Sequence, residues 1–162
     1  MHFGSDEDEY CLLTQPGALL TISLAPPYEG LSRIHVLGNR EGMLSLANVL
    51  LWFHANGSRR EFLSVTSLPF VQRQGMIALS IRMLQEDSTP DDYGWLQLMD
   101  KGQQYEWILP EDDLQPLGLA VHRLACFPEH GYDLLPNTRR GDAWIWLELL
   151  SNRPESESVS QP

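Results

Sequence analysis

Alternation of apolar and polar residues predicts two strands near the start of the chain. In residues 20–24 every second position is Leu or Ile, and the positions between them are Thr and Ser. This two-residue period is typical of a strand with one buried face. Residues 26–30, which contain two prolines and a glycine, predict a loop, and Ile34 with Val36 begins a second strand.

A helix is predicted over residues 40–56, where the apolar period lengthens from two residues to about 3.6. Asn39 can cap its first turn, and Gly57 stands where a helix-ending glycine is common. The apolar positions that recur at helical spacing are Met43, Leu46, Ala47 and Leu50.

The rest of the pattern predicts five further strands and a second helix, in the order ββαββββαβ. Because neighbouring strands are joined by short connections, hairpins are favoured. We therefore expect an α+β fold with a mainly antiparallel sheet of about six to seven strands and two helices packed on one face. The further strands are expected at 60–66, 76–84, 94–99, 104–109 and 143–150, and the helix at 114–125, with Asp113 as its cap and Pro128 beyond its end.

The length of 162 residues suits one domain, which we expect at residues 10–150. Residues 1–9 include four consecutive acidic residues, and residues 151–162 are rich in Ser and Pro. Neither segment offers enough apolar surface to offset the entropy of ordering. We expect a disordered acidic tail over 1–9 and a second disordered tail over 151–162.

The charge narrows the classes of partner. The chain has 22 acidic residues against 11 Lys and Arg, so its formal net charge is −11. Proteins that bind nucleic acid or anionic membranes normally have the opposite sign, so we expect neither partner. No secretion signal and no apolar run of membrane-spanning length is visible, which favours the cytoplasm, and Cys11 and Cys126 are expected to be free thiols.

Two patterns resemble ligand sites but have simpler structural interpretations. Residues 38–42 lie between a strand and a helix, as phosphate-binding loops do, but they lack the Lys-Ser/Thr ending. His122, Cys126 and His130 recur every four residues, yet a proline interrupts them and no fourth zinc ligand lies near.

Catalytic groups are not marked by any motif. Cys126 has no recognisable histidine partner in the sequence pattern. Adjacent acidic residues such as Asp91 and Asp92 are typical of solvated turns. We therefore expect no catalytic residue, no cofactor and no metal, and a protein that is not an enzyme.

Residues 86–113 combine strong negative charge with aromatic side chains. The segment holds nine acidic residues, one lysine, two tyrosines and two tryptophans. Trp95 and Trp107 fit either the core or the surface of a hairpin. An acidic rim around aromatic anchors would steer and hold a basic protein partner. The residues that we expect to bind this partner are Glu86, Asp87, Asp91, Asp92, Tyr93, Trp95, Asp100, Glu111, Asp112 and Asp113.

The predicted strand around Val36, the turn at residues 38–43 (Gly-Asn-Arg-Glu-Gly-Met) and the Leu- and Ala-rich helix after it resemble a known family. Small α+β immunity proteins of bacterial polymorphic toxin systems carry a strand, a Gly-Asn-x-x-Gly-Leu turn and such a helix. The resemblance covers about residues 18–85, and Met43 stands where leucine is usual. It implies a non-enzymatic protein that binds and blocks a toxin made by the same cell.

Charge and resemblance lead to one functional hypothesis and leave two alternatives open. The hypothesis is an acidic binding protein that neutralises a basic protein partner, namely an immunity protein against a bacterial toxin. The first alternative is a small-ligand-binding or enzymatic domain with a pocket between sheet and helices that contains His54 or His122. The second is a homodimeric structural or adaptor protein that associates through its last strand, with Trp144 and Trp146 on an outer face.

Overall fold

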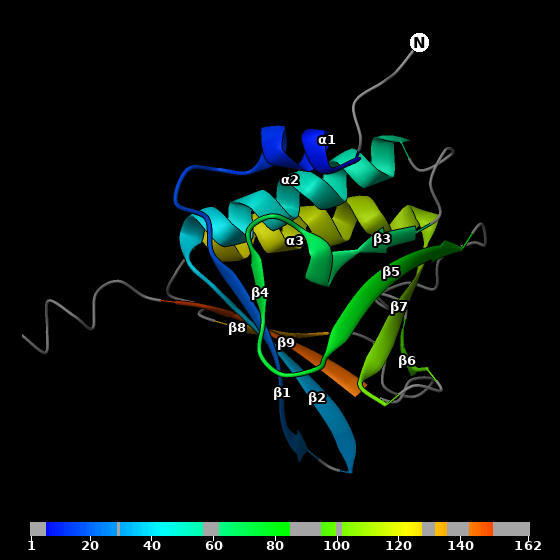
Figure 1. The fold of residues 1–162 in the computed structure, drawn as a ribbon. Helices are drawn as coiled ribbons and strands as arrows, with labels where there is room; N and C mark the ends of the chain where they lie inside the picture. Colours follow the sequence, from blue (N-terminus) through cyan, green and yellow to red (C-terminus); the bar gives the residue numbers. More distant parts are fainter. Residues whose placement is uncertain are drawn as a thin grey trace, which may run out of the picture.

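In the computed structural model, the helices gather on one side of a curled sheet, in an α+β arrangement (Figure 1). The structure describes residues 6–28, 30–56, 62–84, 95–99, 102–127, 132–135 and 143–150. The elements are α1 (Asp6–Leu13), β1 (Leu20–Tyr28), β2 (Leu31–Gly38), α2 (Arg40–Asn56), β3 (Phe62–Ser64), the 3-10 turn η2 (Val65–Ser67), β4 (Val71–Arg73), β5 (Ala78–Leu84), β6 (Trp95–Leu98), β7 (Gln104–Pro110), the 3-10 turn η3 (Glu111–Asp113), α3 (Leu114–Cys126), β8 (Tyr132–Leu135) and β9 (Ala143–Leu149).

The sheet has the strand order β3-β5-β7-β6-β9-β2-β1-β4, and β8 pairs with β9 beside this path. Its two end strands, β3 and β4, are separated by residues 65–70 alone, so the sheet curls until its ends approach each other. This short connection bonds to both ends of the curl. Leu79 of β5 donates its backbone N–H to the Thr66 hydroxyl at 3.3 Å, and Leu20 of β1 donates to the Phe70 carbonyl at 2.9 Å.

The expected α+β fold is observed, and the expectation of a mainly antiparallel sheet holds roughly: five of the eight described strand pairs are antiparallel, and the sheet is mixed. The pairs β1–β4, β2–β9 and β5–β7 are parallel. The hairpins β1–β2 and β6–β7 are antiparallel, since a short turn can only reverse the chain. The described sheet also has nine strands rather than six to seven. The additional strands β4 and β8 are too short to show an alternating pattern.

The loop predicted at residues 26–30 begins later than expected, because β1 continues to Tyr28. Proline is tolerated in this strand for two reasons. Strand β4 pairs only with residues 20–22, which leaves Pro26 on an open strand edge. The register with β2 also shifts between Ala25 and Tyr28, so the regular ladder is already interrupted there.

The two predicted helices are confirmed and pack together over the concave side of the sheet. Helix α2 has the predicted bounds of 40–56, and α3 ends one residue later than predicted. Gly118 lets them approach closely, because a Cβ at this position would lie 2.9 Å from the Leu51 side chain. None of the helices in the described ranges is long and apolar enough to cross a bilayer. The largest fully buried side chains include Phe53, Leu20, Ile22, Ile34, Met43, Leu50, Ile77, Leu79 and Ile81.

Helix α1 differs from the expected acidic tail over residues 1–9, since it already begins at Asp6. It is held by contacts that lie far apart in sequence and that a local pattern cannot show. Tyr10 packs edge-to-face on Trp52 of α2 with ring centroids 5.5 Å apart, and burial raises the pKa of Tyr10 above its ordinary value. The remainder of the predicted tails, residues 1–5 and 151–162, lies outside the described residues.

Candidate functional site

The junction between β7 and α3 holds the described part of the predicted acidic site. Strand β7 ends at Pro110, which pairs with Leu84, and the chain then forms η3. Leu114 donates its N–H to the Glu111 carbonyl and begins α3. A strand therefore changes into a helix within three consecutive acidic residues.

The three acidic residues of η3 differ in their exposure. Asp112 is exposed and Glu111 is partly exposed, and neither forms an ion pair or a side-chain hydrogen bond with any part of the chain that the structure describes. Asp113 is only 8% exposed, so it offers little surface to a partner. It stands at the N-cap of α3 as predicted, but its carboxylate makes no capping hydrogen bond to the helix.

The chain segment with five of the predicted residues begins and ends beside this junction. Leu84, the last residue of β5, pairs with Pro110, and Trp95, the first residue of β6, pairs with Ile108. Both flanks of residues 85–94 are thus fixed at the end of β7 that carries Glu111 and Asp112. The predicted residues Glu86, Asp87, Asp91, Asp92 and Tyr93 themselves lie outside the described residues, and of Trp95 only the backbone is described.

Other acidic and aromatic residues of the segment are placed elsewhere. Met99 and Gly102, which flank the undescribed Asp100, lie at the opposite end of β7, roughly 20 Å from η3 at the usual rise of a strand. Glu106 is already paired, because its Oε1 accepts a 2.6 Å hydrogen bond from Arg82 Nε on the neighbouring strand. Trp107 is 5% exposed and belongs to the core.

The residues that resemble a phosphate loop serve the fold. Asn39 Oδ1 accepts hydrogen bonds from the N–H groups of Gly42 at 2.7 Å and Leu19 at 3.0 Å. Asn39 Nδ2 donates to the Gly17 carbonyl at 2.8 Å. A Cβ at Gly42 would overlap the Leu19 carbonyl, so glycine is needed for this close approach. The predicted capped turn is therefore observed, and the glycines have a structural reason.

The histidine–cysteine ladder is reduced to one contact on the surface of α3. Cys126 Sγ lies 3.7 Å from His122 Nδ1, and both side chains are exposed. His130 lies outside the described residues. No group of three or more His, Cys, Asp or Glu side chains in the described ranges is arranged to hold a metal ion.

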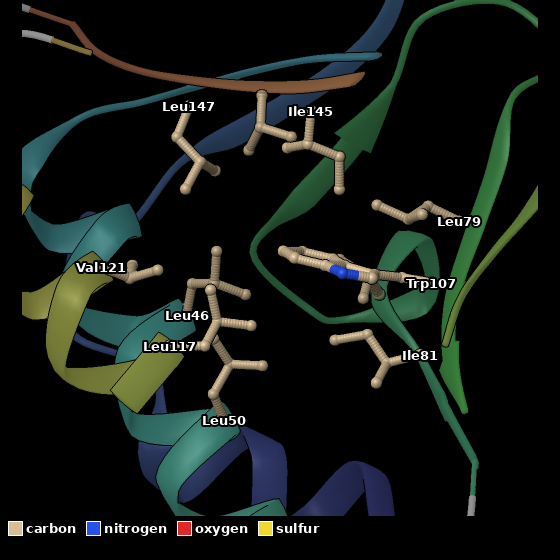
Figure 2. Close-up of a pocket in the computed structure, with 11 residues that line it drawn as sticks. Leu46, Leu50, Leu79, Ile81, Trp107, Leu117, Val121, Ile145 and Leu147 are labelled. Atoms are coloured by element: carbon tan, nitrogen blue, oxygen red, sulfur yellow. The ribbon is translucent and has the colours of Figure 1, made fainter. Parts of the chain in front are cut away.

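Apolar side chains of the sheet and the helices converge on the space between them, as Figure 2 shows. The cavity there has a volume of about 20 Å³, which is room for about one water molecule and far too little for a ligand. Trp107 projects into it, and neither His54 nor His122 lines it. The ligand pocket expected under the first alternative is therefore not formed by the described residues. The lining consists of Val36, Leu46, Leu50, Val65, Leu79, Ile81, Trp107, Leu117, Val121, Ile145 and Leu147.

The outer face of the sheet carries a second group of polar and aromatic side chains, of which the sequence predicted the tryptophans of β9 but not their partners on β2. The Arg33 guanidinium lies 4.7 Å from the centroid of the Trp146 ring, and His35 Nε2 lies 2.7 Å from Glu148 Oε1. These pairs join β2 to β9 across more than a hundred residues of sequence, so no local pattern could reveal them. The predicted division of β9 into an inner apolar face and an outer face with Trp144 is confirmed.

Strand β9 cannot offer a free edge to a second copy of the chain. It is hydrogen-bonded to β2 along one side and to β8 along the other, with β6 meeting it at Ala143. Association through the last strand, as in the second alternative, would therefore have to use its outer face. That face is already occupied in part by the contact between Arg33 and Trp146.

No protein-family model matches the chain, and no curated protein and no solved structure is significantly similar to it.

Proposed function

We propose that this protein is a non-enzymatic acidic binding protein that neutralises a basic protein partner, and that it acts as an immunity protein against a bacterial toxin. The observation that carries the proposal is the pair of carboxylates at Glu111 and Asp112. Both lie at the surface beside the flanks of the strongly acidic segment, and neither is neutralised by a described cation. Within a chain of net charge −11, they are groups that the fold leaves for a partner.

The interior supports a role in surface binding over a role in pocket chemistry. A small-ligand site usually requires a concave cavity of several hundred Å³, and the cavity between sheet and helices measures about 20 Å³. A protein inhibitor needs only a complementary surface, which can lie on a rigid strand–helix junction. The proposed cellular location of the protein is the cytoplasm, where such a toxin would harm the cell that makes it.

The resemblance at residues 38–43 adds less than its motif suggests. Asn39 and Gly42 are required by the geometry of the β2–α2 turn, so any fold with this turn would favour them. The proposal therefore relies on the charge at Glu111 and Asp112, and the resemblance supplies the class of partner.

The test is a titration of the full chain with toxin domains encoded beside its gene, followed by calorimetry at increasing salt. We expect the affinity to fall by about tenfold or more from low to high salt, because the attraction between exposed charges is screened. The double variant Glu111→Gln plus Asp112→Asn should weaken binding by about tenfold. Asp91 and Asp92 of this chain are also expected to bind the partner, and replacing both by lysine should weaken the binding further.

The matched control is Gln103→Lys plus Gln104→Lys. These residues are exposed at the opposite end of β7, and the substitution changes the net charge by the same two units. If the control weakens binding as much as the variant at Glu111 and Asp112, only the total charge matters and the site is wrong. If no basic protein domain binds at any salt concentration, the proposed function is wrong.

A further inference from the structure

The outward face of α3 is unusually poor in charge for a helix in so acidic a protein. The chain has 22 acidic residues, and none lies within residues 114–126. Leu119 is 50% exposed on this face, and Phe127, directly after the helix, is 48% exposed. Depletion of charge together with exposed large apolar side chains is typical of the centre of a protein interface.

A groove runs along the same face. It has a volume of about 420 Å³ and, among the described residues, is lined by one stripe of the helix. The stripe has small or apolar side chains over most of its length, so the backbone of a second helix could approach closely. The lining residues are Gln115, Pro116, Leu119, Ala120 and Arg123.

The two ends of this stripe carry opposite charges. Glu111 and Asp112 precede its first turn, and Arg123 lies in its last turn. From Asp112 to Arg123 the helix rise corresponds to roughly 16 Å, or three turns. The helix dipole accounts for the sign of the charges at each end, but it does not account for the exposed leucine and the groove between them.

We propose that this face of α3, from Glu111 to Arg123, is the docking surface for one amphipathic helix of the basic partner, packed antiparallel to α3. The partner helix would place basic side chains of its last turn against Glu111 and Asp112, and an acidic side chain of its first turn against Arg123. Its apolar stripe would cover Leu119 and Ala120. That the partner is basic rests on the proposed function. The position of the docking surface and the direction of the partner helix follow from α3 alone.

The experiment uses two synthetic peptides of about 15 residues, which is about four helical turns. Both have Leu and Ala on one face and the same composition. The first has two Glu in its first turn and two Lys in its last turn, and the second has these charges exchanged. Each is titrated into the isotope-labelled full chain while the backbone amide signals are followed.

We expect the first peptide to shift amide signals of residues 111–123 and to bind about tenfold more tightly than the second. Leu119→Glu should abolish the shifts. The control is Leu12→Glu on α1, where leucine is 82% exposed and the added charge is the same, and it should leave the shifts unchanged. Far-ultraviolet circular dichroism of both variants verifies that the helices persist.

A charge exchange keeps the proposal falsifiable should the leucine variant misfold. The variant Glu111→Lys, Asp112→Lys and Arg123→Glu should prefer the second peptide over the first. Equal affinity of the wild-type chain for both peptides, or shifts located away from α3, would overturn the docking surface. The peptide readout concerns α3 alone, whereas failure of every toxin domain to bind in the calorimetric test would reject the proposed function instead.

Discussion

The two strand-to-helix junctions β2–α2 and β7–α3 differ in how they use their polar groups. At the β2–α2 junction, the amide of Asn39 bonds to Gly42, Leu19 and Gly17, so both of its polar atoms are used by the fold. At the β7–α3 junction, Glu111 and Asp112 bond to none of the described residues. Polar groups that the fold does not need are the better candidates for contacts with another molecule.

The β2–α2 junction also shows how a short sequence motif can arise from packing alone. The chain before β1 crosses the start of α2 so closely that the Leu19 carbonyl touches the position of a Gly42 side chain. The Gly-Asn-x-x-Gly pattern then follows from local geometry and specifies no ligand. At the second junction, Glu111 and Asp112 form no ion pair or side-chain hydrogen bond with the described residues. The helix dipole favours acidic residues there, and both carboxylates stay at least partly exposed.

The largest loss of stability is expected from Gly42→Ala. The added Cβ would overlap a backbone carbonyl, which cannot rotate away, so the junction must shift at a cost of about 3 kcal/mol. Chemical denaturation measures this loss. Gly118→Ala is the matched control, because its Cβ meets the flexible Leu51 side chain and alanine favours the helix, so its change should stay within about 1 kcal/mol. Equal losses in both variants would contradict the special role of Gly42.

Asn39→Ala is expected to cost about 2 kcal/mol. The substitution removes the cap of α2 and leaves the Leu19 N–H and the Gly17 carbonyl without their partner. Asn39→Asp keeps the accepting oxygen and loses only the donor to Gly17. Its loss of stability should therefore be about half of the loss in Asn39→Ala. The measurement is the free energy of unfolding of the wild type and both variants. Equal values for Asn39→Ala and Asn39→Asp would show that the capping oxygen is unimportant.

A smaller effect, that of pH on stability, is expected through α1. The residues after this helix lead to Leu19, which contacts the β2–α2 junction. Burial against Trp52 raises the pKa of Tyr10 above its ordinary value. The neutral phenol is therefore favoured in the folded protein, and its stabilising effect is full below the unfolded-state pKa of about 10. That stability is lost as the pH rises from there through the folded-state pKa. Tyr10→Phe should lose less stability than the wild type over this alkaline range, and parallel curves would refute the contribution of Tyr10.

The difference between the junctions was only partly predictable from sequence. The helical period, Asn39 and the glycines are local signals, and they predicted α2 correctly to the residue. The parallel pairing of β2 with β9 depends on residues that lie far apart in the chain, and the pairing of His35 with Glu148 follows from it. Such pairings are decided by the packing of the whole sheet, so a pattern in one segment cannot specify them.

The candidate site was predicted in the same uneven way. The charge count over 86–113 drew attention to Glu111 and Asp112, but it could not separate them from Asp113, which is buried, or from Glu106, which pairs with Arg82. Burial and ion pairing are three-dimensional properties and leave no mark on composition. The absence of acidic residues from 114–126 was visible in the sequence, and it could have indicated the charge-poor face of α3.

The smallest effect on stability is expected from Glu111→Gln plus Asp112→Asn, at about 1 kcal/mol or less for the pair. Exposed acids before a helix contribute only a few tenths of a kcal/mol each through the dipole, and these two have no described partner to lose. The same variant is expected to lose about tenfold in partner affinity, so stability and binding should separate at this junction. At the β2–α2 junction, Asn39→Ala should instead lower stability without changing the affinity of the folded fraction. If the carboxylates at Glu111 and Asp112 prove as costly to remove as Asn39, they belong to the fold, and the contrast between the two junctions disappears.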